Sequence, residues 1–178
     1  MLKISVDKLA AKIIALTLLF VVGCEDKYEP IVYDFELYTE SLTLDDNGYF
    51  HFDLEEGIAN SFTSRTLFVA NPNNPNIQKV VFSASHYWLL GDTLGYIVHD
   101  GYTENLVYVS YDTTYITQFN GFEVPIINSA SYTNTDGLAF SWAAIPYSMV
   151  GDTIYIKAEY FDEYEWLEYE KTIGVVVE

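Results

Sequence analysis

Residues 154–177, IYIKAEYFDEYEWLEYEKTIGVVV, show the clearest alternation of apolar and polar side chains in the chain. Ile154, Ile156 and Ala158 share one parity. In the second half the apolar residues again share one parity, and they are Leu167, Tyr169, Ile173, Val175 and Val177. A period of two is that of a β-strand with one buried face. The stretch therefore predicts two strands that pair antiparallel, with Gly174 marking a bulge or a close approach of backbone.

The chain before this hairpin has the same bias toward strand, because it is rich in Tyr, Phe, Val, Ile and Thr and has no sustained apolar period of 3.6. Further strands are predicted at Tyr33–Leu37, Tyr49–Leu54, Arg65–Ala70, Ile77–Ser85, Leu94–His99, Leu106–Tyr111, Tyr115–Phe119 and Leu138–Trp142, and Pro125 opens another segment. Turns are predicted at Asp45–Gly48, Asn71–Asn76, Asp100-Gly101, Asp112-Thr113 and Asn134–Gly137. About ten short strands with such turns predict an all-β fold, an antiparallel β-sandwich over residues 32–178, with a barrel as the alternative.

The N-terminus has the layout of a secretory signal, in which Lys3, Lys8 and Lys12 precede ten uncharged, mostly apolar residues at 13–22. A helix of this length covers about half of a bilayer's hydrocarbon core, so the run is too short to span it. The next residues, Val21-Val22-Gly23-Cys24, resemble the bacterial lipobox. That resemblance implies a lipoprotein signal peptide at residues 1–23 and a diacylglycerol thioether on Cys24. A plain secretory signal or an uncleaved amphipathic leader is the alternative.

The lipobox resemblance also implies how the rest of the chain is held. Residues 24–31 become a lipidated cysteine and an acidic tether, and the protein is anchored to the membrane without spanning it. Two or three acyl chains anchor stably, whereas one binds only marginally. Glu25-Asp26 resembles the sorting signal of some outer-membrane lipoproteins, and also a retention signal for the inner membrane. We expect a cell-envelope location, in the outer membrane, on its periplasmic or its surface face.

Composition restricts the partners. The chain carries 26 acidic and 8 basic residues, and without residues 1–23 its formal net charge is −20. Nucleic acid and anionic membrane surfaces bind Lys and Arg, so both are excluded as partners of the domain. Cys24 is the only cysteine, and its lipidation would leave none for a disulfide.

The last forty or so residues, with the strand Leu138–Trp142 and the closing hairpin, resemble immunoglobulin-like and fibronectin type III modules of bacterial surface lipoproteins. The resemblance implies an immunoglobulin-like sandwich. It includes no diagnostic pair of cysteines.

No motif in the sequence indicates catalysis. There is no Gly-x-Ser-x-Gly, no Gly-rich phosphate loop and no His-Glu-x-x-His, and the three histidines are isolated. The acidic residues are too many to select a glycosidase pair. Asp45–Gly48 contains only a fragment of a calcium loop and fits a hairpin turn better. We therefore predict no enzyme activity, no cofactor and no metal site.

The surplus of aromatic residues suggests a ligand surface, because flat rings beside carboxylates hold sugars in many sandwich modules. The rings considered are Tyr87, Trp88, Trp142, Tyr160, Tyr164 and Trp166. Trp166, Tyr164 and Trp88 are the candidate ligand contacts, and Trp166 is the best of them because it lies opposite the apolar parity of its strand. The alternative is that these rings form core and cross-strand pairs. The expected function is glycan binding, and the competing one is assembly with another envelope protein.

Overall fold

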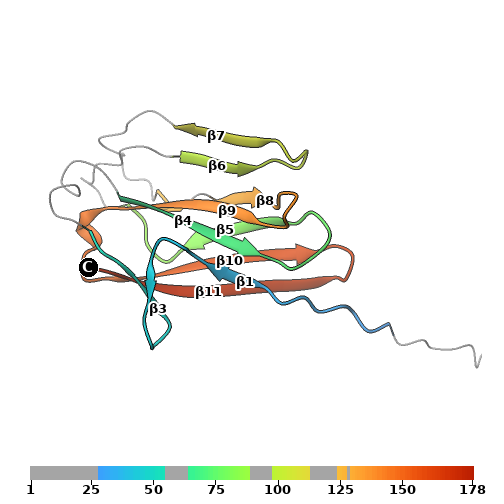
Figure 1. Ribbon diagram of the computed structural model, residues 1–178, viewed down its shortest axis with the longest axis horizontal. Coiled ribbons are helices and arrows are strands. Elements are labelled where there is room, and N and C mark those ends of the chain that lie inside the picture. The colour runs from blue at the N-terminus through green and yellow to red at the C-terminus, as the bar shows by residue number, and fades with distance from the viewer. Residues whose placement is uncertain (1–27, 55–63, 89–97, 113–123, 128) are drawn as a thin grey trace, which may run out of the picture. The chain divides into compact units, whose positions relative to one another are not determined.

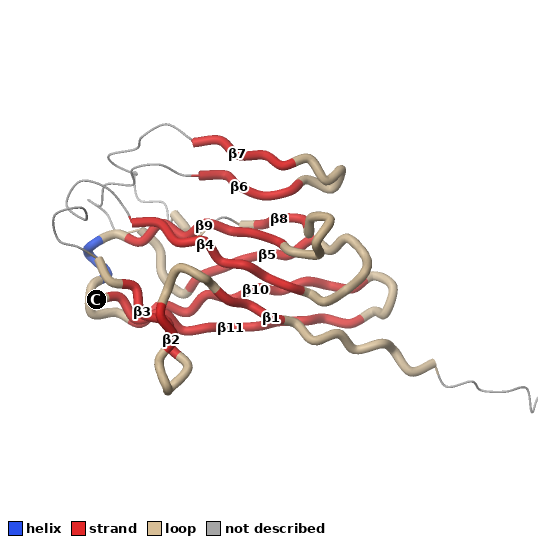
Figure 2. Tube along the Cα trace, in the orientation of Figure 1, coloured by secondary structure: helices blue, strands red, loops and turns tan. Residues whose placement is uncertain are grey.

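The computed structural model describes residues 28–54, 64–88, 98–112, 124–127 and 129–178. The chain divides into compact units of residues 1–30 and 31–178. The second unit is an all-β sandwich of two packed sheets, as predicted (Figure 1). Among the described residues the one helical element is a single 3-10 turn, η1 (Tyr147–Met149), which precedes β10 (Thr153–Asp162) (Figure 2).

The larger sheet is organised around the hairpin of β10 and β11 (Leu167–Val177). These strands pair antiparallel from Thr153 opposite Val176 to Asp162 opposite Leu167, which confirms the predicted closing hairpin. The described strand order is β2-β3-β11-β10-β5-β8-β6-β7. The other bounds are β2 Thr43–Leu44, β3 Tyr49–Phe52, β5 Lys79–Ala84, β8 Ala130–Tyr132, β6 Val98–Tyr102 and β7 Tyr108–Asp112.

The smaller sheet has the order β1-β4-β9, with β1 at Glu36–Tyr38, β4 at Ser64–Asn71 and β9 at Ala139–Ile145. A short segment continues this sheet beyond β9, because Ile127 forms an antiparallel bridge with Ala143 and the Ala144 amide donates to the Ile126 carbonyl at 2.7 Å. Ile126 and Ile127 are buried there.

This connectivity is that of an immunoglobulin-type sandwich. The strands β1, β4 and β9 correspond to A, B and E, and β5, β10 and β11 correspond to C, F and G. The pairing of β3 with β11 is parallel, which departs from the purely antiparallel arrangement expected from the sequence. The strands β6, β7 and β8 lie between the C and E equivalents in sequence and widen the larger sheet.

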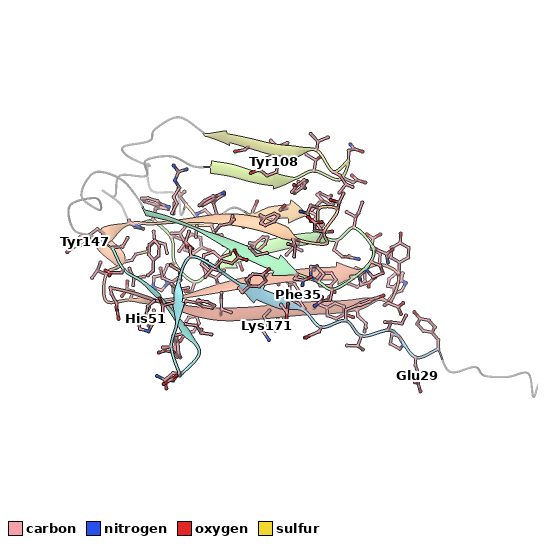
Figure 3. The ribbon with its side chains drawn as sticks, in the orientation of Figure 1. Glu29, Phe35, His51, Tyr108, Tyr147 and Lys171 are labelled. Atoms are coloured by element: carbon pink, nitrogen blue, oxygen red, sulfur yellow. The ribbon has the colours of Figure 1, made fainter. Side chains whose placement is uncertain are left out.

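The core lies between the two sheets. It consists of the apolar side chains that occupy every second position of each strand and point inward. Ile154, Ile156 and Ala158 are fully buried, as are Val175 and Val177 on the neighbouring strand. At one end of the core three rings pack together. Tyr160 stacks on Tyr169 with ring centroids 4.7 Å apart. Phe35, which is labelled in Figure 3, meets Tyr160 edge-on with ring centroids 5.1 Å apart.

Two predicted turns, Asp45–Gly48 and Asn134–Gly137, are confirmed and have the same hydrogen bonds. In the first, Oδ1 of Asp45 accepts from the amides of Asn47 at 2.9 Å and Tyr49 at 2.8 Å. In the second, Oδ1 of Asn134 accepts from the amides of Asp136 and Leu138, each at 2.9 Å. The glycines at 48 and 137 have φ of 85° and 77°, the left-handed region that glycine adopts without strain.

The predicted turn at Asp100-Gly101 is wrong. Both residues lie inside β6, where Asp100 pairs with Ser110 and Gly101 with Val109. The turn comes later, where the Thr103 amide donates to the Val107 carbonyl. The glycine at 101 instead lets the backbone of β6 lie close to Ser131, because a Cβ at this position would lie 2.9 Å from the Cβ of Ser131. The predicted strand Tyr115–Phe119 and the turn residue Thr113 lie outside the described residues, as does most of Leu94–His99.

Candidate functional site

The candidate site is built on the loop that joins β10 to β11, residues 163–166. Its support is Asp162, whose side chain is fully buried. Oδ1 of Asp162 accepts from the amides of Tyr164 at 2.9 Å and Glu165 at 3.3 Å, and Oδ2 accepts from Nδ2 of Asn74 at 2.6 Å. A buried carboxylate that satisfies loop amides fixes their positions, because leaving those amides or the carboxylate unpaired would be costly.

Two aromatic side chains project from this loop into solvent. Tyr164 is 70% exposed and Trp166 is 79% exposed. Trp166 has a φ of 57°, a left-handed conformation that is uncommon for a bulky residue and costs about 1 kcal/mol or more. Its ring meets the Phe161 ring edge-on, with centroids 5.8 Å apart and planes at 83°. Trp166 is thus a large ring exposed to solvent, at a backbone position where glycine would be less strained.

Beside the loop, the outer face of the larger sheet is hollowed into an open depression of about 700 Å³. Its floor is apolar, from Val81 and Phe161, which are 37% and 43% exposed. Strand register assembles it, because Phe161 lies opposite Glu168 on β11 and Glu159 lies opposite Val81 on β5. The charged lining consists of Lys79, Glu159, Glu163, Glu168 and Glu170.

Part of this negative charge is compensated at one side of the depression. Nζ of Lys157 lies 2.6 Å from Oε2 of Glu159 and 3.3 Å from Oε2 of Glu170. The hydrogen bond that Lys157 donates to Glu159, followed by the one that it donates to Glu170, raises the pKa of Lys157. Among the described residues Glu163 and Glu168 have no ion pair, so their carboxylates are free to accept hydrogen bonds from a ligand.

This arrangement suits a polyhydroxylated ligand. An exposed ring face binds the apolar face of a flat molecule, and carboxylate oxygens accept hydrogen bonds from hydroxyl groups. The rings and carboxylates lie on paired strands and on a loop that Asp162 holds, so they are positioned before any ligand arrives.

The structure separates the three ligand contacts predicted from the sequence. Trp166 and Tyr164 lie together on the β10–β11 loop and are solvent-exposed. Trp88 is only 3% exposed and belongs to the core, and its amide donates to the Val124 carbonyl at 2.9 Å. A ring buried in this way cannot contact a ligand at the surface, so the prediction for Trp88 is wrong.

Sequence reasoning missed Phe161 and Val81. Phe161 follows the outward parity of Lys157 and Glu159 on β10, and this parity could have identified it. No sequence signal identifies Val81 as its neighbour, because the order of β5 and β10 in the sheet brings them together.

Other expected features give less information. Within the described ranges no cluster of His, Cys, Asp and Glu side chains is arranged to hold a metal ion. The lipobox residues and Cys24 lie outside the described residues. None of the helical structure described is long and apolar enough to cross a membrane.

No protein-family model matches this chain, and no curated protein sequence is significantly similar to it.

Proposed function

We propose that this protein is a lipid-anchored lipoprotein of the cell envelope, held in the outer membrane, whose non-catalytic β-sandwich binds glycans. The observation that supports this most is Trp166, a strained and 79% exposed ring beside a depression lined with carboxylates. Strained residues cluster at functional sites, because elsewhere nothing offsets the stability that they cost.

The anchor in this proposal is Cys24. The argument for it is the sequence Val21-Val22-Gly23-Cys24 behind a basic and then an apolar segment. In a Cys24→Ala variant we expect the protein to lose its acyl chains and leave the membrane fraction. Metabolic labelling with palmitate and fractionation measure both. A variant that still labels and still fractionates with membranes would contradict the anchor.

The glycan proposal is tested by Trp166→Ala. Because a central tryptophan at a binding site contributes about 2 kcal/mol or more, we expect affinity for the bound polysaccharide to fall roughly 30-fold or more. The melting temperature should change little, since the ring is exposed. The measurement is retention on a panel of neutral polysaccharides, followed by calorimetry on the best ligand.

The matched control for this experiment is Tyr147→Ala. Tyr147 is a 38% exposed aromatic on η1, at the end of β10 opposite to the loop. It should bind like the unmodified protein. If Trp166→Ala binds equally well, or if both variants lose binding together, this surface is not the glycan site.

An assembly role is the second candidate, and one observation favours it. In the described strand order β7 is the last strand of the larger sheet, and Val107 and Tyr108 at its start are 57% and 53% exposed. A strand at a sheet edge can accept a strand from another protein. Crosslinking in cells, followed by recovery of one fixed partner through residues 107–108, would favour assembly over glycan binding.

A further inference from the structure

The chain enters the sandwich beside the Trp166 loop, and three hydrogen bonds hold it there. The Ile31 amide donates to Oε2 of Glu165 at 3.0 Å, and the Tyr33 amide donates to the Tyr169 hydroxyl at 3.1 Å. The same hydroxyl donates to the Ile31 carbonyl at 3.3 Å. In Figure 1 this is the end of the sandwich at which β10 turns into β11.

The length of the chain before this point limits how far the loop can lie from the anchor. Six residues, 25–30, lie between the lipidated Cys24 of the proposed function and Ile31, so seven Cα–Cα steps join the two. Even fully extended they span at most about 24 Å. The β10–β11 loop is therefore the membrane-proximal end of the domain, and Trp166 is held close above the leaflet that carries the anchor.

The surface at this end also has exposed aliphatic groups that a free sugar would not require. Ile31 is 57% exposed and Val32 is 75% exposed, and the Ile31 amide is bonded to Glu165, which lies between the exposed Tyr164 and Trp166 in the loop. Small apolar groups beside amphipathic rings fit the boundary between lipid headgroups and acyl chains.

The charge of this end selects among membrane components. Glu163 and Glu168 line the depression and Glu165 holds Ile31, so a phosphate or a uronic acid would be repelled. An uncharged saccharide meets no such repulsion, and its hydroxyls can donate to these carboxylates.

We propose that the glycan bound at Trp166 is the uncharged saccharide headgroup of a glycolipid in the anchoring membrane. This inference rests on the proposed function, both for the anchor at Cys24 and for sugar binding at Trp166. The short tether confines the binding site to the layer in which such headgroups lie. It therefore raises the effective concentration of the headgroup at the site.

The test uses the full lipidated protein in nanodiscs, labelled with 5-fluorotryptophan. The three tryptophans, 88, 142 and 166, should give separate fluorine resonances, and Trp166→Phe assigns one of them. The discs contain phosphatidylcholine alone, or with diglucosyl or digalactosyl diacylglycerol, or with phosphatidylglycerol. We expect the Trp166 resonance to shift with a glycosyl lipid only, while the resonance of the buried Trp88 stays unchanged.

Three results would overturn the inference. One is no shift with either glycosyl lipid; the polysaccharide panel with soluble Cys24→Ala protein then tells whether the proposed function survives. Another is the same shift in phosphatidylcholine alone, which would mean that the loop contacts the bilayer and no sugar. The last is a shift with phosphatidylglycerol, which would contradict the selection by charge.

A longer tether provides an independent measurement. Inserting 20 Gly and Ser residues between Asp26 and Lys27 lengthens the connection from seven to 27 Cα–Cα steps. Effective concentration falls as about the −3/2 power of tether length, so the apparent affinity for the glycosyl lipid should fall roughly eightfold. Affinity for a free saccharide should stay the same. An unchanged affinity for the glycosyl lipid would contradict the role of the tether.

Discussion

Trp166 occupies a position that its side chain does not favour. Its φ of 57° is the conformation that glycine adopts freely, and among the described aromatic residues its ring meets that of Phe161 edge-on. Since the ring is exposed, neither core packing nor backbone preference explains a tryptophan here. In the proposed function, the ring is needed at the surface to bind the glycan.

This backbone conformation reverses the usual order of alanine and glycine. Because both substitutions remove the ring, the difference between them in the free energy of unfolding reports the cost of the left-handed backbone conformation. Trp166→Gly should be more stable than Trp166→Ala by about 1 kcal/mol, although glycine in a strand or helix is normally the less stable of the two. Urea denaturation of both variants measures the difference. Equal stability, or a more stable alanine variant, would contradict the left-handed conformation.

His51 is a second residue with a measurable signature. Its ring lies between Oδ2 of Asp45 at 3.4 Å and Oε1 of Glu178 at 2.9 Å, and these hydrogen bonds raise its pKa above the usual value of about 6.5. The stability from charged His51 is therefore complete below the unfolded pKa and disappears as the pH rises through the folded pKa.

We accordingly expect the stability advantage of the unmodified protein over His51→Gln to shrink as the pH rises through the raised pKa of His51. Denaturation at a series of pH values measures this advantage, and proton NMR of the imidazole measures the pKa directly. A pKa of His51 at or below the ordinary value would be inconsistent with the contacts to Asp45 and Glu178.

At the scale of elements, each of the two similar turns is held by one side-chain oxygen that accepts hydrogen bonds from two backbone amides. Asn134→Ala removes the side-chain oxygen that accepts from the amides of Asp136 and Leu138, and should destabilise the domain by about 1–2 kcal/mol. Asn134→Asp keeps the oxygen and should be nearly neutral, because the equivalent residue of the other turn is Asp45. Thermal denaturation compares them. Similar losses in both variants would show that the oxygen is not the stabilising group.

The pairing of β11 with β3 depends on a residue without a side chain. A Cβ at Gly174 would lie 2.6 Å from Cδ1 of Tyr49, which is opposite it in the register. Gly174→Ala should therefore cost about 1–3 kcal/mol of stability. Tyr49→Ser should relieve the clash, so that the double variant loses less than the sum of the single ones. Strict additivity in this double-mutant cycle would contradict the close approach.

Alternation was sufficient to predict elements whose apolar face is uniform. The closing hairpin and the buried face of Phe50 and Phe52 follow from parity alone. The turn prediction at Asp100-Gly101 failed, because a glycine required for close contact with Ser131 cannot be distinguished in the sequence from a glycine in a turn. The bulge alternative at Gly174 also fails, since the register with β10 is continuous there.

At the scale of the whole molecule, the sequence predicted two sheets but not their strand order. Parallel pairing of β3 with β11 joins residues more than a hundred positions apart, and no local pattern encodes it. The same limit applies to the site. Trp166 could be selected from its parity, whereas the depression exists only because β5, β10 and β11 lie side by side. Trp88 was misassigned because local composition does not distinguish a buried ring from an exposed one.

In the proposed function, the whole molecule combines a short lipid anchor with a binding face at the end of the domain nearest to it. The most direct test of this combination is to map where a bound saccharide touches the protein, by NMR titration of the sandwich with the best ligand of the panel. We predict that shifts concentrate on the indole of Trp166, on Phe161 and on Glu168. Shifts confined to other strands, with Trp166 unaffected by a saccharide that binds, would contradict a glycan site at the β10–β11 loop.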